Sequence, residues 1–335
     1  MHILLKGRKE ENVRYSSIDA FRFILACLIV GIHNPYEMPF WITVIFKIAV
    51  PLFFMISGFF NVYDTRQKAI EKNKISIIRI GKLAIMANAF YILWGIITHI
   101  YEMPGYILWV LSPSNIIKSI VFNDTPAKVH LWFLSALVMC YVLSYLISKY
   151  EISDKIYLCI IPCLVVLTII EWDNIIIHKD IYNIYYRNFW FFGGAYFLIG
   201  SFIRKNIDKF RIKINVIPAT VLCVIAYVLA LIETKIAGNN DVYTILLIPE
   251  IIIFISLINH PDFLKNSFIE RWGMKYSLLI YIFHPVFIDV FVMFIYGRQI
   301  DTRIAAYIMI PVVVITMLIV LEIYKITSAC VPWQR

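Results

Sequence analysis

An arginine and a histidine lie eleven residues apart in the first long apolar run, at Arg22 and His33. At 100° per residue they face the same side of a helix, about 16 Å apart along its axis. An ionisable side chain within a membrane span costs about 3 kcal/mol or more and by default marks a functional site. Asp19, one turn before Arg22, is placed to form an ion pair with it. The alternative is that Arg22 reaches the lipid headgroups while His33 meets water at the opposite boundary.

A second pair of basic residues, Arg79 and Lys82, lies three residues apart at the start of another apolar run. Neighbouring on one helix face, they form a cationic patch. Two fixed cations there would suit phosphates or a nucleotide-like diphosphate. The spacing alone is better explained by ordinary anchoring of a span by positive residues on the cytoplasmic side.

Several further polar or small residues lie within or beside the apolar runs. They are Lys47, Ser57, Trp132, Glu250, His284 and Asp289. Ser57 and the glycine after it permit close helix contact, and Pro51 can bend that helix toward a cavity. Trp132 fits either an interfacial aromatic belt or a binding role. His284 is either a packed bundle histidine or, beside the helix-breaking Pro285, a residue that faces a cavity.

The elements that must hold these residues are membrane spans. The 335-residue chain is 61% hydrophobic and 16% charged, which is more apolar surface than one soluble core can bury. An apolar run of about 20 residues matches the hydrocarbon thickness of a bilayer. The sequence therefore predicts an all-α, polytopic membrane helix bundle. The expected spans are 16–33, 41–61, 77–100, 130–148, 156–171, 189–203, 214–233, 242–259, 277–296 and 304–326.

The distribution of basic residues predicts the orientation of the bundle. Twenty of the 31 Lys and Arg residues fall in segments that this layout places inside, counting Lys325 at the inner end of the last span; seven fall in outer segments, and the other four lie within spans. This positive-inside bias predicts a cell-membrane protein with both termini in the cytoplasm, and it accounts for the net charge of +9 without a nucleic-acid partner. We expect one membrane domain over 1–335, with a cytoplasmic segment at 1–15 and a cytoplasmic tail at 327–335. The outer loop at 101–129 is expected to include an interfacial helix.

The six cysteines predict neither a disulfide framework nor a metal site. Five lie inside apolar runs and the sixth lies near the C-terminus. Cys159 and Cys163 share a helical face, but two thiols without further ligands make a poor metal site.

Taken together, these residues resemble the acyltransferase-3 family of integral membrane O-acyltransferases. Four segments carry the resemblance. Arg22 and His33 match the family's Arg-x10-His motif, and Phe53–Phe59 resembles its FFxxSGF segment. Arg79 and Lys82 correspond to its Arg-x-x-Arg pair, and His130–Leu134 resembles its Trp-Phe-Leu segment. The resemblance covers essentially the whole chain. Lys82 replaces the second arginine of the pair, which keeps the charge but loses the bidentate fork.

The resemblance implies transfer of an acyl group, usually acetyl, from cytoplasmic acyl-CoA to a hydroxyl of a cell-envelope polysaccharide or its lipid-linked precursor. His33 would act as general base or carry the acyl group transiently. Arg22, oriented by Asp19, would contact CoA or stabilise developing charge. The residues expected to bind substrate are Arg79, Lys82, Ser57, Trp132 and His284. The partners are acyl-CoA, the sugar acceptor and membrane lipid, with no metal.

Two other functions compete with this interpretation. Glu250 and His284 would also fit a transporter of a small polar solute, such as an amino acid, or of a glycan intermediate, although the sequence shows no inverted repeat. The bundle could instead be a non-catalytic partner of a polysaccharide synthase. Some family members carry a hydrolase-like or a racemase domain. We expect neither here, so the membrane domain would complete the transfer itself.

Overall fold

The computed structural model describes residues 14–98, 103–177, 187–212, 214–237, 243–296, 298 and 300–330. Over these residues the chain forms helices and turns and no strand, which confirms the all-α prediction. The helices that coincide with the ten predicted spans are α1 (Ser16–Ile32), α2 (Phe40–Phe46) with α3 (Ala49–Phe59), α4 (Arg66–Thr98), α7 (Trp132–Lys149), α8 (Ile160–Ile177), α9 (Gly194–Lys205), α11 (Val216–Ala237), α12 (Leu247–Asn259), α13 (Phe268–Ile295) and α14 (Thr302–Cys330).

Short helical turns lead into four of these helices. They are η2 (Val129–Leu131) before α7, η3 (Asp154–Cys159) before α8, the π-helical turn η5 (Phe189–Gly193) before α9, and η6 (Thr244–Leu246) before α12. A four-residue helix, α10 (Ile207–Phe210), follows α9.

Seven of the predicted spans are long and apolar enough to cross a bilayer, within the described part of the chain. The other three are α1 with 17 residues, α9 with 12 and α12 with 13. The lipid-facing helices expose large apolar side chains, such as Ile85 on α4 and Ile217 on α11. The chain is therefore a multi-pass helical membrane protein.

The loop expected to include an interfacial helix contains two helices, α5 (Met103–Val110) and α6 (Pro113–Phe122). They are bent by 43° relative to each other, and as a pair they have the length and composition of a broken span or a re-entrant loop. Pro113 begins α6 directly after its N-cap Ser112, a position that tolerates a missing backbone N–H.

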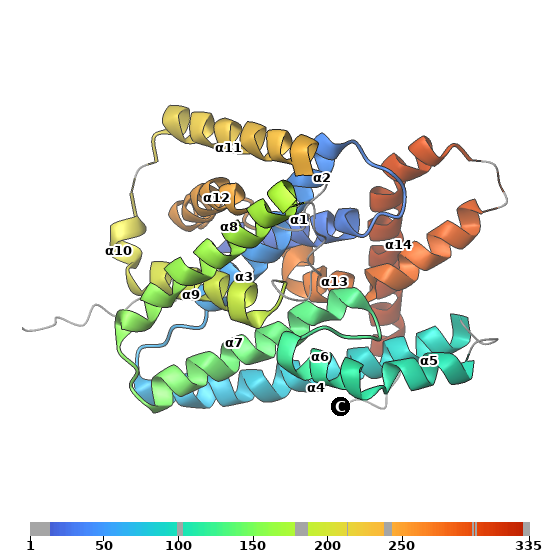
Figure 1. Cartoon of the computed structure of the whole chain (residues 1–335), viewed down its shortest axis with the longest axis horizontal. Coiled ribbons are helices and arrows are strands. Elements are labelled where there is room, and N and C mark those ends of the chain that lie inside the picture. Colours follow the sequence, from blue (N-terminus) through green and yellow to red (C-terminus); the bar gives the residue numbers. More distant parts are fainter. Residues whose placement is uncertain are drawn as a thin grey trace, which may run out of the picture.

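The helices pack as a central group that is surrounded by outer helices. Figure 1 shows α4 and α7 side by side along one edge, α11 at the opposite edge and α14 across one end of the central helices. The most extensive contacts join α1 to α13, α3 to α9 and α4 to α7.

Glycines allow two of the central crossings. A Cβ at Gly58 would overlap the backbone of Phe197, and a Cβ at Gly200 would overlap the backbone of Met55, so α3 and α9 touch main chain to main chain. The Ser201 hydroxyl donates to the Gly58 carbonyl at 3.0 Å across this contact. Gly273 on α13 lies equally close to the Asp19 carbonyl of α1.

Candidate active site

Three histidines from separate elements form a cluster beside the C-terminus of α1. His33 is the C-cap residue of α1, His130 lies in η2 and His284 lies in α13. The ring centroid of His33 lies 5.0 Å from that of His284 and 6.1 Å from that of His130, and the His130 and His284 centroids are 5.1 Å apart. We call these three residues the histidine cluster.

The orientation of His284 follows from the proline after it. Pro285 has no N–H, so the Tyr281 carbonyl one turn earlier loses its helical donor. His284 Nδ1 lies 2.8 Å from that carbonyl oxygen and 3.1 Å from the Ile280 carbonyl oxygen. Because carbonyls only accept, Nδ1 holds the proton. The buried Nε2 is then a lone-pair acceptor without a hydrogen-bond partner among the described residues.

In His130 the other ring nitrogen bonds a main-chain carbonyl. Its Nε2 lies 3.1 Å from the Ile282 carbonyl oxygen, so Nε2 holds the proton. The Tyr91 hydroxyl donates to the same Ile282 carbonyl at 2.7 Å, and the Tyr281 hydroxyl donates to the His130 carbonyl. Within the described chain, the buried Nδ1 of His130 has no hydrogen-bond partner. The cluster thus contains two acceptor nitrogens whose tautomers are set by main-chain carbonyls.

A small cavity of about 50 Å³ opens beside His33 and His130 and is otherwise largely apolar. Trp132 lines it, as do two cations, Lys47 and Arg187. The Arg187 guanidinium lies 5.8 Å from the centre of the Trp132 ring. We call this space the His33 cavity.

Lys47 lines the cavity from a short interruption in the helix of the second span. Helix α2 ends at Phe46 and α3 begins at Ala49. Pro51 cannot donate to the Lys47 carbonyl, four residues before it, so the regular helix cannot continue through this point. The helix is therefore interrupted one turn before Pro51, and Lys47 at this interruption lines the His33 cavity.

The other end of α1 holds the predicted cationic residues. Arg22 Nη1 donates to Asp19 Oδ1 at 2.9 Å, so the structure contains the expected ion pair, and the guanidinium lies 5.1 Å from the centre of the Phe60 ring. Tyr141 interacts electrostatically with both Arg22 and Arg79. The two arginines of α1 and α4 are therefore both within electrostatic range of one tyrosine of α7.

Lys82 is exposed on α4, one turn beyond Arg79, which is also exposed. The structure thus separates the predicted site residues into two groups. His33, Trp132 and His284 lie together at one end of α1, and Asp19, Arg22 and Arg79 lie at the other, about 16 Å along the helix axis.

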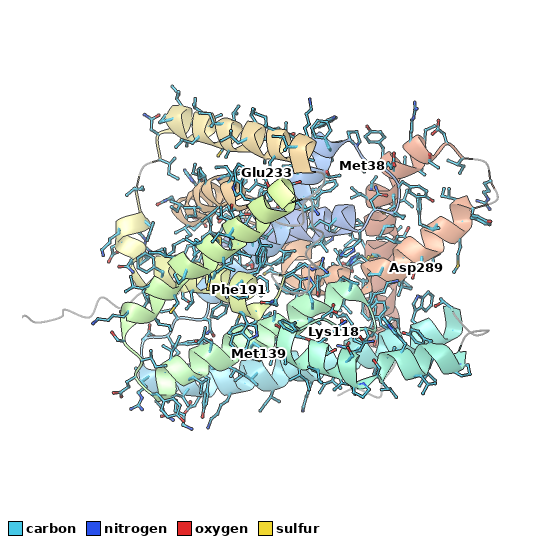
Figure 2. The ribbon with its side chains drawn as sticks, in the orientation of Figure 1. Met38, Lys118, Met139, Phe191, Glu233 and Asp289 are labelled. Carbon is cyan, nitrogen blue, oxygen red and sulfur yellow. The ribbon has the colours of Figure 1, made fainter. Side chains whose placement is uncertain are left out.

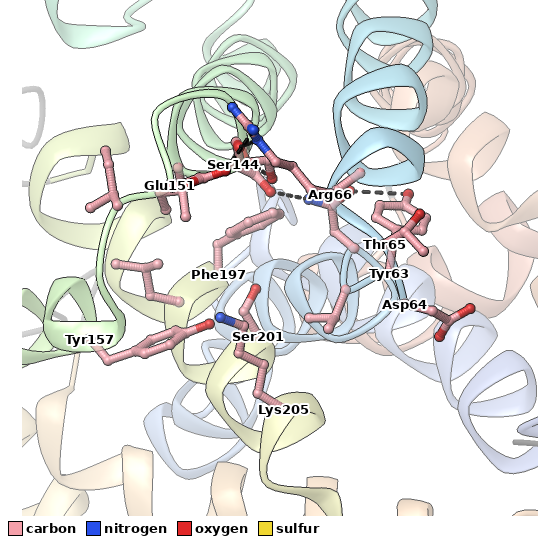
Figure 3. A pocket seen from close by; sticks show the side chains of 17 residues that line it. Tyr63, Asp64, Thr65, Arg66, Ser144, Glu151, Tyr157, Phe197, Ser201 and Lys205 are labelled. Carbon is pink, nitrogen blue, oxygen red and sulfur yellow. Dashed lines mark hydrogen bonds and ion pairs between the residues drawn. The ribbon is translucent and has the colours of Figure 1, made fainter. Parts of the chain in front are cut away.

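A polar hollow of about 330 Å³ lies at the arginine end, between the start of α4 and the ends of α7 and α9. Figure 3 shows Arg66 reaching across it toward Glu151, with which it forms a 2.6 Å ion pair, and Lys205 beside the ring of Tyr157. Tyr63 also lines the hollow and interacts electrostatically with Arg79.

Three remaining candidates lie outside both groups. Ser57 is half-buried, and its hydroxyl donates to the Phe53 carbonyl of its own helix at 2.8 Å. Glu250 lies in the first turn of α12 and is buried with a hydrogen bond to Tyr196. Asp289, labelled on α13 in Figure 2, accepts from Trp94 Nε1 at 3.0 Å and lies 3.4 Å from Lys128 Nζ.

The sequence alone assigns no role to His130, Tyr91, Tyr281 or Arg187. His130 stands two residues before Trp132, at the start of the segment that resembles the family's Trp-Phe-Leu motif. An ionisable histidine at the start of a membrane span is the signal that could have identified His130 as a site residue. Arg187 stands out only once the fold brings η5 against α7. No group of three or more His, Cys, Asp or Glu residues that could hold a metal occurs in the described ranges.

Comparison with known proteins identifies the family. The model of the acyltransferase-3 family, described as an acyltransferase domain, matches residues 15–322. Two curated relatives from Enterococcus faecalis, both called amino-acid racemase, are 28% identical over 269 residues and 25% identical over 306 residues, which is 75% and 82% of this chain. A serine/alanine racemase of Enterococcus gallinarum is 25% identical over 309 residues.

The chain spans 36% to 41% of the length of these three relatives. No solved structure matches it. The family model covers nearly the whole chain, including both groups of site residues and the helices that carry them. The chain belongs to the acyltransferase-3 family of membrane acyltransferases.

Proposed function

We propose that this membrane acyltransferase moves an acetyl group from cytoplasmic acetyl-CoA to a hydroxyl of a cell-envelope polysaccharide or its lipid-linked precursor. The observation that carries the proposal is the histidine cluster, where the ring of His33 forms a triangle with two imidazoles that each have an acceptor nitrogen. Acyl transfer to a hydroxyl needs a base for the hydroxyl proton, and a neutral histidine provides one.

The donor would bind at the opposite end of α1. Arg22 and Arg79 both interact electrostatically with Tyr141 there, and the polar hollow beside Tyr63 is large enough for part of a nucleotide. In this proposal Arg79, with Lys82, contacts the CoA phosphates, and the pantetheine arm extends along the bundle toward His33. Both termini would lie in the cytoplasm, as the distribution of basic residues predicts.

The proposed reaction begins with transfer of the acceptor hydroxyl proton to His33. The acceptor oxygen forms a bond to the thioester carbonyl carbon, the carbon–sulfur bond breaks, and the CoA thiolate leaves and takes up a proton. Trp132 forms one wall of the cavity in which the hydroxyl would sit. His284 and His130 act as positioning residues, because their rings lie 5.0 and 6.1 Å, centre to centre, from the imidazole that receives the proton.

The proposal is tested by replacing His33 with Gln, which removes the base and keeps a similar volume. Inside-out membrane vesicles supplied with acetyl-labelled CoA should lose base-labile label on glycan by at least about 100-fold. His260→Gln is the matched control, since His260 is an exposed histidine at the end of α12. Wild-type labelling by His33→Gln, at equal protein level, would rule out the mechanism.

Transport of an amino acid is the second candidate. The relatives carry the names amino-acid racemase and serine/alanine racemase, and their similarity to this chain covers well under half of their length. A transporter would move labelled serine into vesicles without any acyl donor, whereas the acyltransferase requires acetyl-CoA. Serine uptake that depends on this chain and is independent of acetyl-CoA would favour transport.

A further inference from the structure

A hollow of about 390 Å³ adjoins the His33 cavity and shares Ile32 and Lys47 with it. Its walls come from the end of α1, from α2 and from the turn between them, where Figure 2 labels Met38. Small-molecule sites occupy about 300 to 1,000 Å³, whereas the His33 cavity, at about 50 Å³, admits only a reacting group. The hollow therefore has room for an acceptor unit beside that group, and we call it the α1–α2 hollow.

The turn that forms this hollow is tied to the neighbouring helices. Asn34 Oδ1 accepts from the Tyr36 backbone N–H at 3.0 Å, and Asn34 Nδ2 donates to the Ala306 carbonyl of α14 at 2.9 Å. The Tyr36 ring lies 6.3 Å, centre to centre, from the ring of Phe291 on α13. A ligand in the α1–α2 hollow would therefore meet walls that are already ordered, which lowers the entropic cost of binding.

The lining of the hollow combines aromatic and polar side chains and has no net charge. Tyr36 and Phe40 contribute aromatic rings, and Thr43 contributes a hydroxyl. Its charged lining residues are one acid, Glu37, and one base, Lys47. Aromatic rings offer apolar surface to the C–H groups of a sugar, and a few placed polar groups bind its hydroxyls. This combination suits an uncharged ligand that is rich in hydroxyl groups.

Glu37 is the lining residue that distinguishes among acceptors. Its side chain is exposed, and it forms no hydrogen bond or ion pair with the residues that the structure describes, whereas Lys47 already has an interaction partner. A carboxylate accepts short, strong hydrogen bonds from hydroxyl groups. It also repels a phosphate or carboxylate group of a ligand placed beside it. Glu37 therefore favours a neutral sugar unit over an anionic one.

We propose that the α1–α2 hollow binds the sugar unit that is acylated, that this unit is uncharged, and that Glu37 accepts hydrogen bonds from its hydroxyl groups. This inference rests on the acyl-transfer function proposed above. It adds the chemical class of the acceptor and a residue that selects it. The rest of the polymer is not specified, because the hollow has room only for a small unit.

The test uses the native cells with the gene deleted and then complemented by wild-type or variant protein. Envelope glycans are collected after a short pulse of isotopically labelled acetate. Fragmentation in a mass spectrometer then assigns each labelled, base-labile acetyl ester to one sugar unit of the glycan. Esters that are present with wild-type protein and absent with His33→Gln should lie on units that carry no phosphate, carboxylate or free amine.

Replacement of Glu37 by Gln tests the residue itself. Glu37→Gln keeps the side-chain volume and removes the charge, so it should lower the number of esters formed during the pulse about tenfold or more, as loss of charge-assisted hydrogen bonds predicts. Asp301→Asn is the matched control. It removes one exposed acid from the loop between α13 and α14, and its amide oxygen can still accept from the Arg303 backbone N–H. It should leave ester formation unchanged.

Two results would overturn the inference and leave acyl transfer in place. One is a His33-dependent ester on a charged sugar unit, which can be read from wild-type and His33→Gln cells even if Glu37→Gln does not accumulate. The other is equal ester formation by Glu37→Gln and Asp301→Asn at equal protein level. Absence of any His33-dependent ester from the glycans would instead reject the proposed acyl transfer itself.

Discussion

At the scale of residues, the two buried histidines are held by main-chain carbonyls and not by carboxylates. His284 bonds through Nδ1 to the Tyr281 carbonyl that Pro285 leaves without a donor, and His130 bonds through Nε2 to the Ile282 carbonyl. A carbonyl fixes the tautomer without adding charge. Each imidazole can therefore remain neutral beside His33.

Two substitutions of His284 separate the structural role of its Nδ1–H group from the proposed role of its Nε2 atom in the reaction. In His284→Asn the new side-chain amide can donate in place of Nδ1 but has no counterpart of Nε2, so we expect near-normal stability and acyl transfer lowered about 100-fold. His284→Ala should show the same loss and also destabilise the bundle, because it leaves the Tyr281 carbonyl unpaired.

The measurements are initial rates of transfer in vesicles and thermal unfolding midpoints in detergent. Wild-type rates in His284→Asn would show that Nε2 has no part in the reaction. Equal midpoints for the two His284 variants would show that the carbonyl bond contributes nothing to stability.

At the scale of elements, the α3–α9 crossing depends on glycine. Gly200→Ala places a Cβ against the Met55 backbone, so we expect the free energy of unfolding to fall by about 2 kcal/mol. Gly81→Ala is the matched control: a Cβ at Gly81 on α4 meets nothing within 4 Å, and alanine favours the helix. Thermal unfolding in detergent measures both variants, and equal midpoints would contradict the crossing.

The sequence predicts the spans well because each depends on a local apolar run. It also points to the helix interruption near Pro51 and to the close contact at Gly58, since both residue types have direct backbone effects. It does not identify Gly200 or Gly273 as contact points, because the partner of a helix is set by residues distant in the chain. His130 was missed for the same reason: its role appears only when η2 meets α13.

At the scale of the whole molecule, the distribution of basic residues predicts which ends of the bundle face the cytoplasm. On a background with all six cysteines replaced by serine, Lys118→Cys on α6 should react with a membrane-impermeant maleimide in intact cells. Lys209→Cys on α10 should react only after permeabilisation. The opposite pattern would invert the orientation and place the histidine cluster near the cytoplasm.

The two prolines beside the histidine cluster have a consequence for engineering. Pro51 and Pro285 each deprive a helix of one backbone hydrogen bond. Pro51 lies four residues after Lys47, which lines the His33 cavity, and Pro285 directly follows His284 of the histidine cluster. Substitution of either proline by a good helix former would restore that bond, so stability screening would favour it. At Pro285 the restored N–H would compete with His284 for the Tyr281 carbonyl. A thermostabilised form selected without regard to activity would therefore tend to lose the position of the His284 imidazole, because that position depends on the missing helical hydrogen bond.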